Sequence, residues 1–458
     1  MFAGCGSKND SNTSDKNTGD TSVAEDTADA ADAASSNLSD DGKVLNIYCW
    51  NEEFKSRITA HYPDYQEVDA THGKIGDVDV VWNITPNDDN AYQNNLDATL
   101  LNQADAPADD KIDLFLVEAD YALKYVDTDY TVPVKDLGIT DDDLSKQYQY
   151  TKDIVTDSKG VLKGLSWQGC PGVLFYNRDA AKEVLGTDDP DKVQESVKDW
   201  DTYNDTAKKM KDAGYKMTAS ANDTYRVYSN NVTSKWVDGN KINIDDNIMK
   251  WVDDSKAQVD AGETGTCDLW SDDWSKGFYP QGKVFCYFGP AWLVNFSMAA
   301  DTEGSIGYNG GWGAAQGPQG FFWGGTWICA AQGTDNANLV KDIMLKMTTD
   351  DDIMKDIVVD DDDFVNNSTV MNGLADGSIK VKDDKEYTSK ILGGQNPLPM
   401  YCAGVETLDL SNLSSYDQGC NEEFQNAMKN YFEGKASKED ALDLFYKAVT
   451  EKYPELTY

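Results

Sequence analysis

The sequence predicts an α/β fold with largely parallel sheets. Short apolar runs that suit buried strands recur along the chain, and segments with helical spacing of apolar residues separate them. Hydrophobic residues make up 40% of the 458 residues, which is enough for a large packed core. A chain of this length is expected to form two or three domain-sized units.

The first third of the chain contains three predicted strands. The first covers residues 44–50 and ends in the polar loop 51–53, and the second covers residues 78–84. The third covers residues 112–117 and leads into a helix over residues 121–125. This order of strands and helix predicts an α/β unit.

Polar side chains follow the carboxyl ends of the first and third of these strands. They are Asn51, Glu52, Glu118 and Asp120. Ligands of open α/β sheets bind beyond the carboxyl ends of the strands. We therefore expect these four side chains to emerge at a binding site.

A second unit is predicted to begin near residue 155. Its first strand covers residues 173–177, and a helix over 179–185 follows and ends at Gly186. A buried strand is predicted over residues 283–288, and a further one over 326–330 follows a glycine-rich stretch. We detect no internal repeat.

The chain begins with Phe2-Ala3-Gly4-Cys5 and continues in an acidic stretch rich in Ser, Thr, Asn, Asp and Ala up to Gly42. The small-small-Cys start resembles a bacterial lipobox, in which Cys5 would become the lipidated N-terminus of the mature protein. Residues 1–42 would then be a lipobox and a disordered acidic tether. No apolar run reaches the ~20 residues needed to span a bilayer, so we expect an extracellular protein held at the outer face of the cell membrane by lipid alone. The alternative is a buried or accidental cysteine.

Charge excludes one class of ligand and disfavours another. The formal net charge is −41, and a surface this acidic repels phosphates. Nucleic acid is therefore excluded as a partner, and anionic substrates are disfavoured.

Cysteine and carboxylate spacing predict no metal site and no cofactor. The eight cysteines contain no CxxC pair, and several lie in apolar runs where a free thiol behaves as a small hydrophobe. The acidic run Asp360–Asp363 lacks the alternating ligands and central Gly of an EF-hand loop. We interpret this run as a solvated surface.

Five separated segments follow one another in the order of a known family: residues 43–54, 112–125, 164–185, 282–292 and 313–331. Together with the lipobox-like start and the acidic tether, they resemble the extracellular solute-binding proteins of carbohydrate ABC importers, the maltose-binding-protein class. The resemblance implies a periplasmic-binding-protein-like fold of type II. In that fold two α/β lobes, each a mainly parallel sheet flanked by helices, are joined by hinge strands.

The resemblance also implies lobes that are discontinuous in sequence. The first would combine residues 43–154 with 311–347, and the second would combine 155–310 with 348–458. Such a protein captures a neutral mono- or oligosaccharide between its lobes and delivers it to the permease subunits of an ABC importer. We expect a monomer that is not an enzyme and needs no cofactor.

A sugar site needs aromatic planes for stacking and short polar side chains for hydrogen bonds. Trp323 lies beside Gly324 and Gly325, where the absent Cβ atoms would let ligand and backbone approach closely. Trp292 follows a predicted strand and a Gly-Pro turn, which places it at the mouth of a loop. The alternative for both rings is packing on the core.

The resemblance suggests further ligand contacts. Trp167 and Gln168 resemble the contact region of the second lobe, and Asp120 occupies the position of an acceptor for sugar hydroxyls. Glu118 is a second choice for that acceptor, while Asp120 could instead cap the following helix. For Trp50, packing in the core is favoured over ligand contact.

Two other tryptophans, Trp270 and Trp274, are four residues apart. On a helix they would share one face, so we expect them to pack against each other and not to bind ligand.

Two alternative functions stay open. A secreted carbohydrate-active enzyme could use Glu52 and Glu118 as acid and base, although the chain lacks GxSxG, HExxH, P-loop and GxGxxG motifs and has only two His. A surface glycan-binding lipoprotein could use the same fold without an importer.

Overall fold

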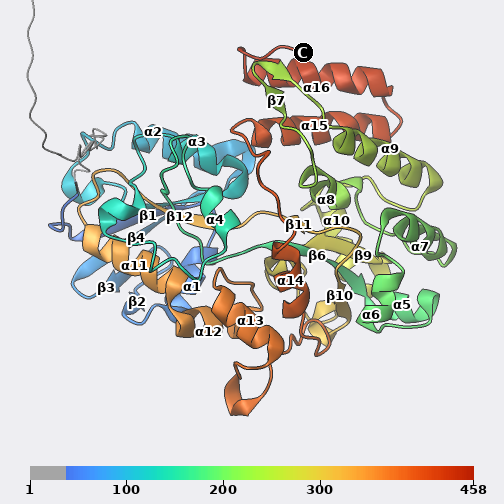
Figure 1. The fold of residues 1–458 in the computed structure, drawn as a ribbon, viewed down its shortest axis with the longest axis horizontal. Helices are drawn as coiled ribbons and strands as arrows, with labels where there is room; N and C mark the ends of the chain where they lie inside the picture. Colours follow the sequence, from blue (N-terminus) through green and yellow to red (C-terminus); the bar gives the residue numbers. More distant parts are fainter. Residues whose placement is uncertain (1–37) are drawn as a thin grey trace, which may run out of the picture. The chain divides into compact units, whose positions relative to one another are not determined.

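The computed structural model describes residues 38–458, so Cys5 and almost all of the expected tether lie outside the described residues. Among the described residues, the early part of the chain forms a six-stranded sheet in the order β12-β5-β1-β4-β3-β2 (Figure 1). Its strands are β1 (Val44–Cys49), β2 (Tyr65–Glu67), β3 (His72–Ile75), β4 (Val78–Ile84), β5 (Leu114–Glu118) and β12 (Thr326–Ala330). The predicted strands over 78–84 and 326–330 are confirmed, and those over 44–50 and 112–117 are confirmed with small shifts of their ends.

Strand β1 lies inside this sheet because both of its edges are paired. It pairs in parallel with β4 and β5, and Leu45, Ile47 and Cys49 are buried. The outer strands β3, β2 and β12 are antiparallel to their neighbours, so the sheet is mixed. The helices around it are α1 (Glu53–His61), α2 (Ala91–Leu100), α3 (Ala122–Val126), α4 (Gln149–Asp153), α11 (Ala337–Thr349) and α12 (Asp351–Asp361).

The second sheet is built on one central strand, β6 (Pro171–Asn177). Its partners are β9 (Cys286–Gly289), β10 (Trp312–Ala315) and β11 (Phe321–Phe322), and all three pair antiparallel with it. The two-lobe α/β fold is confirmed, but this sheet is not parallel as expected. A buried apolar run has the same composition in either direction, so the sequence pattern did not reveal the pairing.

Helices and one hairpin complete this half of the chain, drawn from green through yellow and orange to red in Figure 1. The hairpin joins β7 (Val237–Asp238) and β8 (Lys241–Ile242). The helices are α5 (Arg178–Leu185), α6 (Pro190–Glu195), α7 (Trp200–Asp212), α8 (Tyr225–Ser229), α9 (Asp246–Ala261), α10 (Asp272–Ser275), α13 (Ser368–Asp376), α14 (Leu398–Val405), α15 (Asp417–Phe432) and α16 (Lys438–Lys452).

Three segments run side by side between the two sheets: residues 166–170, 323–326 and 363–366. We call them the hinge segments. The amide of Gly169 donates to the Phe364 carbonyl over 2.9 Å, and the amide of Trp323 donates to the Cys170 carbonyl over 3.3 Å. The chain therefore passes between the sheets more than once.

The expected lobe boundaries fall elsewhere than these crossings. Strands β10 and β11 pair with β6, although residues 311–347 were assigned to the first lobe. Helix α12 contacts α1, although residues 348–458 were assigned to the second lobe. We therefore propose boundaries at the hinge segments.

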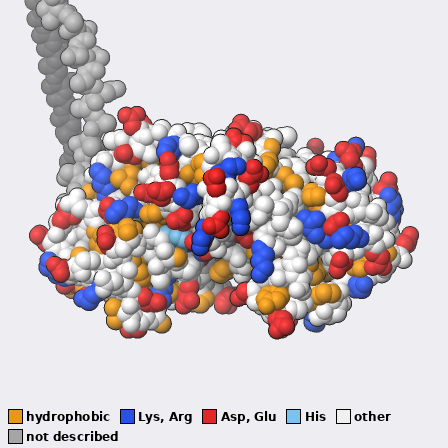
Figure 2. Space-filling model, turned by 90° about the horizontal axis from the view of Figure 1, so that it is seen from below, with side chains coloured by type: hydrophobic (Ala, Val, Ile, Leu, Met, Phe, Trp, Pro, Cys, Tyr) orange, Lys and Arg blue, Asp and Glu red, His pale blue; other side chains and the backbone are white. Residues whose placement is uncertain are grey.

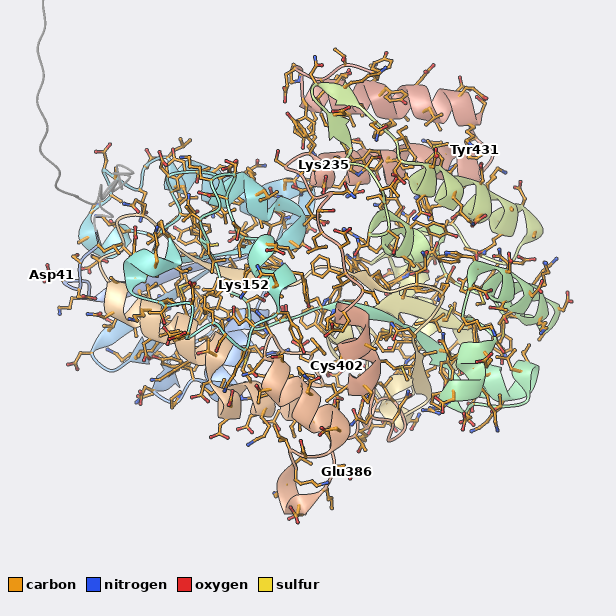
Figure 3. The ribbon with its side chains drawn as sticks, in the orientation of Figure 1. Asp41, Lys152, Lys235, Glu386, Cys402 and Tyr431 are labelled. Carbon is orange, nitrogen blue, oxygen red and sulfur yellow. The ribbon has the colours of Figure 1, made fainter. Side chains whose placement is uncertain are left out.

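Charged side chains of both signs share the surface. On the face shown in Figure 2, Asp and Glu are interspersed with Lys and Arg, and hydrophobic side chains lie between them. The seven cysteines of the described residues are free thiols. Cys402 on α14, labelled in Figure 3, is half-buried, whereas Cys286 and Cys329 are buried in apolar strands.

Candidate ligand-binding site

Two adjoining cavities of about 320 and 310 Å³ lie between the two lobes. Both are lined by Trp50, Glu118, Trp270 and Trp323, and we call the combined space the tryptophan cleft. Each volume is within the range of roughly 300 to 1,000 Å³ that is common for small-ligand sites.

Three tryptophan rings form one wall of the cleft. The ring centroids of Trp292 and Trp323 are 5.3 Å apart, and that of Trp270 lies 5.6 Å from Trp323 and 6.2 Å from Trp292. The indole N–H of Trp292 donates to the backbone carbonyl of Trp323 over 3.3 Å, which ties the Trp292 ring to the backbone beside the Trp323 ring. Both rings remain partly exposed and can present a face to a ligand.

The glycines beside Trp323 are required by the backbone. Gly324 and Gly325 have φ values of +68° and +101°, a region that L-residues rarely adopt. A Cβ atom on Gly325 would lie 2.8 Å from Cys170 Sγ, and one on Gly324 would lie 3.2 Å from the Trp292 ring. The close approach at these two glycines is made by protein atoms, and the approach of a ligand stays a prediction.

Trp270 was not predicted to line the site. The expected helix begins only at Asp272, with Ser271 as its N-cap, so Trp270 lies outside it and adopts a φ of +68°. Its ring still contacts Trp274, at 5.0 Å, but is 53% exposed in the cleft. Trp274 packs as predicted, buried and donating to Asp223 Oδ1 over 2.8 Å.

The acidic end of the cleft is formed by Glu118 and Asp120 at the carboxyl end of β5. Glu118 caps the short helical turn that follows, because its side chain accepts from the Asp120 amide over 2.7 Å. Burial raises the pKa of Glu118 well above its ordinary value, and the Asp120 carboxylate adds to this, whereas Arg226 opposes it. Asp120 caps no helix through its side chain and instead forms a two-pronged ion pair with Arg226 of α8.

Amide and carboxyl side chains from both lobes complete the lining. These groups suit hydroxyl recognition because amides both donate and accept hydrogen bonds and ionised carboxylates accept them. They are Asn51, Asn87, Asn222, Gln418, Glu422 and Gln425. Of the last five, Asn87 and Asn222 come from separate segments, whereas Gln418, Glu422 and Gln425 lie on one helix, α15, at a spacing of four and three residues that places them on one face.

Three predicted residues occupy other places. Glu52 is exposed and does not line the cleft, since helix α1 begins at the next residue and turns Glu53 inward instead. Trp167 is fully buried and stacks on Phe54 at 5.2 Å, which is core packing. Gln168 borders the cleft but is 1% exposed and already hydrogen-bonded.

Gln168 ties the hinge segments to the first lobe. Its side-chain amide donates to Glu53 over 2.8 Å and to Asp363 over 3.0 Å, and its carbonyl accepts from the Thr326 amide. Burial raises the pKa of Glu53 to about 7, and Asp363 adds to this rise while Arg57 opposes it. We call this group the hinge network.

The hinge network corrects the interpretation of Asp360–Asp363 as a solvated surface. Asp363 is 2% exposed, and Asp361 is ion-paired with Arg57 over 2.9 Å. Asp361 and Asp363 of the acidic run are therefore bound at the hinge, whereas Asp360 is exposed as expected. A run of like charges gives no sign of burial when its cationic partner lies three hundred residues away in sequence.

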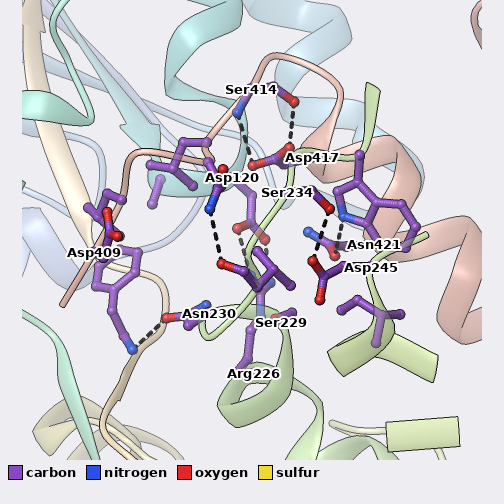
Figure 4. Close-up of a pocket in the computed structure, with 18 of the residues that line it drawn as sticks. Asp120, Arg226, Ser229, Asn230, Ser234, Asp245, Asp409, Ser414, Asp417 and Asn421 are labelled. Carbon is purple, nitrogen blue, oxygen red and sulfur yellow. Dashed lines mark hydrogen bonds and ion pairs between the residues drawn. The ribbon is translucent and has the colours of Figure 1, made fainter. Parts of the chain in front are cut away.

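A smaller cavity of about 60 Å³, drawn in Figure 4, lies beside the cleft. We call it the rear chamber. Asp120 and Arg226 line both the chamber and the cleft. The remaining walls come from residues 119–123, Ile154, Phe322 and the segments 229–248 and 409–421. Its volume has room for only a few water molecules.

The described part of the chain holds no group of three or more His, Cys, Asp or Glu side chains placed to bind a metal ion. Among residues 38–458, no helix has the length and apolar composition needed to cross a membrane.

A family model described as a bacterial extracellular solute-binding protein matches residues 69–388. The chain therefore belongs to the bacterial extracellular solute-binding proteins. No curated protein matches the sequence.

Solved structures share the fold over most of their length. An extracellular solute-binding protein of family 1 is 17% identical, with a TM-score of 0.69 over 89% of this chain and 99% of that one. The ABC transporter associated binding protein from B. animalis subsp. lactis Bl-04, in complex with beta-1,6-galactobiose, is 19% identical, with a TM-score of 0.65 over 91% and 99%. Maltose-bound T. maritima MalE3 is 13% identical, with a TM-score of 0.62 over 89% and 99%.

Proposed function

We propose that this solute-binding protein captures a neutral sugar, in particular an oligosaccharide, in the tryptophan cleft and delivers it to an ABC importer. The observation that carries the proposal is the wall formed by Trp270, Trp292 and Trp323 opposite a polar lining. Stacking on the apolar face of a sugar and hydrogen bonding to its hydroxyls need these two kinds of surface together.

The charge of the cleft supports a ligand that is not anionic. Glu118, Asp120, Asp223 and Glu422 line it, and Arg226 is the cation beside them. A carboxylate or phosphate on the ligand would meet net negative charge in a partly buried site, which is unfavourable. The sugars named for the structural neighbours, beta-1,6-galactobiose and maltose, are neutral.

A glycan panel measured by isothermal titration calorimetry tests this proposal. The panel should contain maltodextrins, β-1,6-linked galacto-oligosaccharides and, as matched anionic ligands, uronic-acid oligosaccharides of the same length. We expect saturable binding of at least one neutral series and none of the anionic one. Failure of every neutral sugar to bind would refute the sugar specificity.

The enzyme alternative is not favoured by the placement of the carboxylates. Glu52 does not line the cleft, Asp120 is bound to Arg226, and Glu53 is bound to Gln168. Of the other carboxylates in the cleft, Asp223 accepts from the Trp274 indole and Glu422 accepts from the Gln418 side chain. Glu118 therefore faces no carboxylate in the cleft that lacks a hydrogen-bond partner. Chromatography of the sugars after long incubation should recover them unchanged, and cleavage products would support the enzyme instead.

Anchoring and delivery rest on the N-terminal sequence and on the family. Phe2-Ala3-Gly4-Cys5 supports lipidation of Cys5 and a place at the outer face of the cell membrane. In the full-length precursor, Cys5→Ser should move the protein from the membrane fraction to the medium, with Cys402→Ser as the matched control. Sugar-stimulated ATP hydrolysis by the cognate permease complex in proteoliposomes would separate an importer subunit from a surface lipoprotein that works alone.

A further inference from the structure

The tryptophan cleft and the rear chamber are separated by one pair of side chains. Asp120, in the turn after β5, belongs to the first lobe, and Arg226, on α8, belongs to the second. Both residues line both cavities, and Figure 4 shows them at the rear chamber. The pair is therefore a wall with a cavity on each side.

Arg226 is held in this wall by contacts on two sides. Its guanidinium donates to both carboxylate oxygens of Asp120, one of them over 2.7 Å, and it lies 6.0 Å from the centroid of the Trp323 ring. A planar guanidinium that is both bidentate and placed over an aromatic face has little freedom to move. The same side chain thus borders the stacking surface and closes the space beyond it.

The space beyond is polar enough to bind a sugar but too small. Ser229, one helical turn after Arg226, carries a buried hydroxyl with no hydrogen-bond partner among the described residues. Asn230 and Asn412 add amide groups to the same lining. At about 60 Å³, however, the chamber is several-fold smaller than a typical ligand pocket.

We infer that Arg226 forms the end wall of the sugar site and limits the length of the oligosaccharide that binds. This inference rests on the proposed function, because it concerns the same cleft. A sugar chain that lies along the tryptophan wall meets the guanidinium at this end. Removing the arginine side chain would join the chamber to the cleft and extend the site.

Two double variants test this inference. Asp120→Asn/Arg226→Ala removes the wall without leaving Asp120 charged and unpaired, whereas Asp120→Asn/Arg226→Met removes the ion pair but keeps an unbranched side chain in its place. Lys124→Met/Asp97→Asn is the matched control, because it removes an ion pair of the first lobe that lines neither cavity. Each protein is titrated with maltodextrins and with β-1,6-linked galacto-oligosaccharides from disaccharide to pentasaccharide.

In the series that the wild type binds, we expect its affinity to fall at least tenfold from the preferred length to the pentasaccharide. The ratio of the affinity for the preferred length to the affinity for the pentasaccharide should be less than threefold in the alanine variant. The methionine variant and the control should keep the ratio of the wild type. An unchanged ratio in a folded alanine variant, or an equal reduction in the methionine variant, would overturn the steric end wall. If the alanine variant does not fold, Asp120→Asn/Arg226→Val replaces it, since valine is shorter than methionine and should relax the ratio at least twofold, and an unchanged ratio refutes the wall. Absence of binding to every sugar by the wild type refutes the proposed function itself.

Discussion

At the scale of single residues, Trp270 combines an exposed ring with a left-handed backbone. A non-glycine residue in this region costs roughly 1 kcal/mol or more, which the local packing must offset. Trp270→Gly and Trp270→Ala remove the same ring, but only glycine relieves the backbone. We expect the glycine variant to exceed the alanine variant in free energy of unfolding by about 1 kcal/mol, measured by urea denaturation.

At a position with negative φ, we expect the alanine variant to be more stable than the glycine variant, because glycine loses more conformational entropy on folding than alanine. Val68, which is exposed and has no positive φ, provides the matched pair Val68→Gly and Val68→Ala. Equal stabilities of the two Trp270 variants would show that its backbone carries no strain.

Trp323 is the residue whose loss should weaken binding most directly. Trp323→Ala removes a stacking plane from the cleft, so affinity for a bound sugar should fall by about 1 to 3 kcal/mol, roughly tenfold or more. Calorimetry measures the change, and thermal melts establish that the variant is folded. Tyr308→Ala, which removes an exposed aromatic ring outside the cleft, should leave affinity unchanged. Wild-type affinity in folded Trp323→Ala would assign the ring to packing.

Several residues of the candidate site could be predicted from the sequence. Two residues that were missed lie next to helix starts whose exact position the sequence did not show. Trp292, Trp323 and Glu118 lie together as predicted, because strand ends and glycine-rich turns are visible in sequence. Trp270 was assigned to a helix that starts two residues later. Glu53 was expected in a loop, but it is the first residue of helix α1. A shift of the helix start by one residue would change which of Glu52 and Glu53 faces inward.

At the scale of elements, the hinge network makes stability depend on pH. Glu53 has a pKa of about 7 in the folded protein against an ordinary value of 4.5, so the folded state binds the proton more tightly. This contribution is fully present below about pH 4.5 and is lost as the pH rises through about 7. The difference amounts to a free energy on the order of 3 kcal/mol.

Glu53→Gln keeps the hydrogen-bonding shape and removes the titration. Urea unfolding at pH 5 and pH 7.5 should show a larger loss of stability with rising pH in the wild type than in this variant. Other buried carboxyls with raised pKa values, such as Asp223, are present in both proteins and cancel in the comparison. Glu52→Gln, at the exposed neighbour, should behave like the wild type.

The strands of the sheet could be predicted, but their pairing could not. Residues 326–330 form β12 at the predicted positions because a continuous apolar run suits a strand buried on both faces. That run pairs antiparallel with β5, which lies some two hundred residues earlier. The direction and the partner of a strand depend on how distant segments of the chain pack together, and the local composition of the strand does not show this.

At the scale of the whole chain, polar contacts among the described residues join the lobes, and two of them lie at the polar end of the cleft. Asp120 pairs with Arg226, and the Gln418 side chain donates to Asn90 over 3.4 Å. A sugar that touches both lobes should favour the closed arrangement by the difference in its affinity for the two states. We expect ligand-free Asp120→Asn/Arg226→Ala to have a larger radius of gyration than the wild type in small-angle scattering.

Addition of a saturating sugar should then reduce the radius of gyration of both proteins. The control Lys124→Met/Asp97→Asn should match the wild type with and without sugar. No difference between the double variant and the wild type in either condition would mean that the ion pair does not hold the lobes together.

The free cysteines give this protein built-in reporters of motion. Cys170 lies in a hinge segment, 1% exposed, with its sulfur against Gly325 of the adjacent hinge segment. A thiol reagent can reach that sulfur only while the hinge segments are apart, whereas it reaches the strand-buried Cys286 only after the sheet opens. The labelling rate of Cys170 therefore reports a local opening of the hinge and that of Cys286 a global opening of the sheet, and no cysteine has to be introduced by mutation.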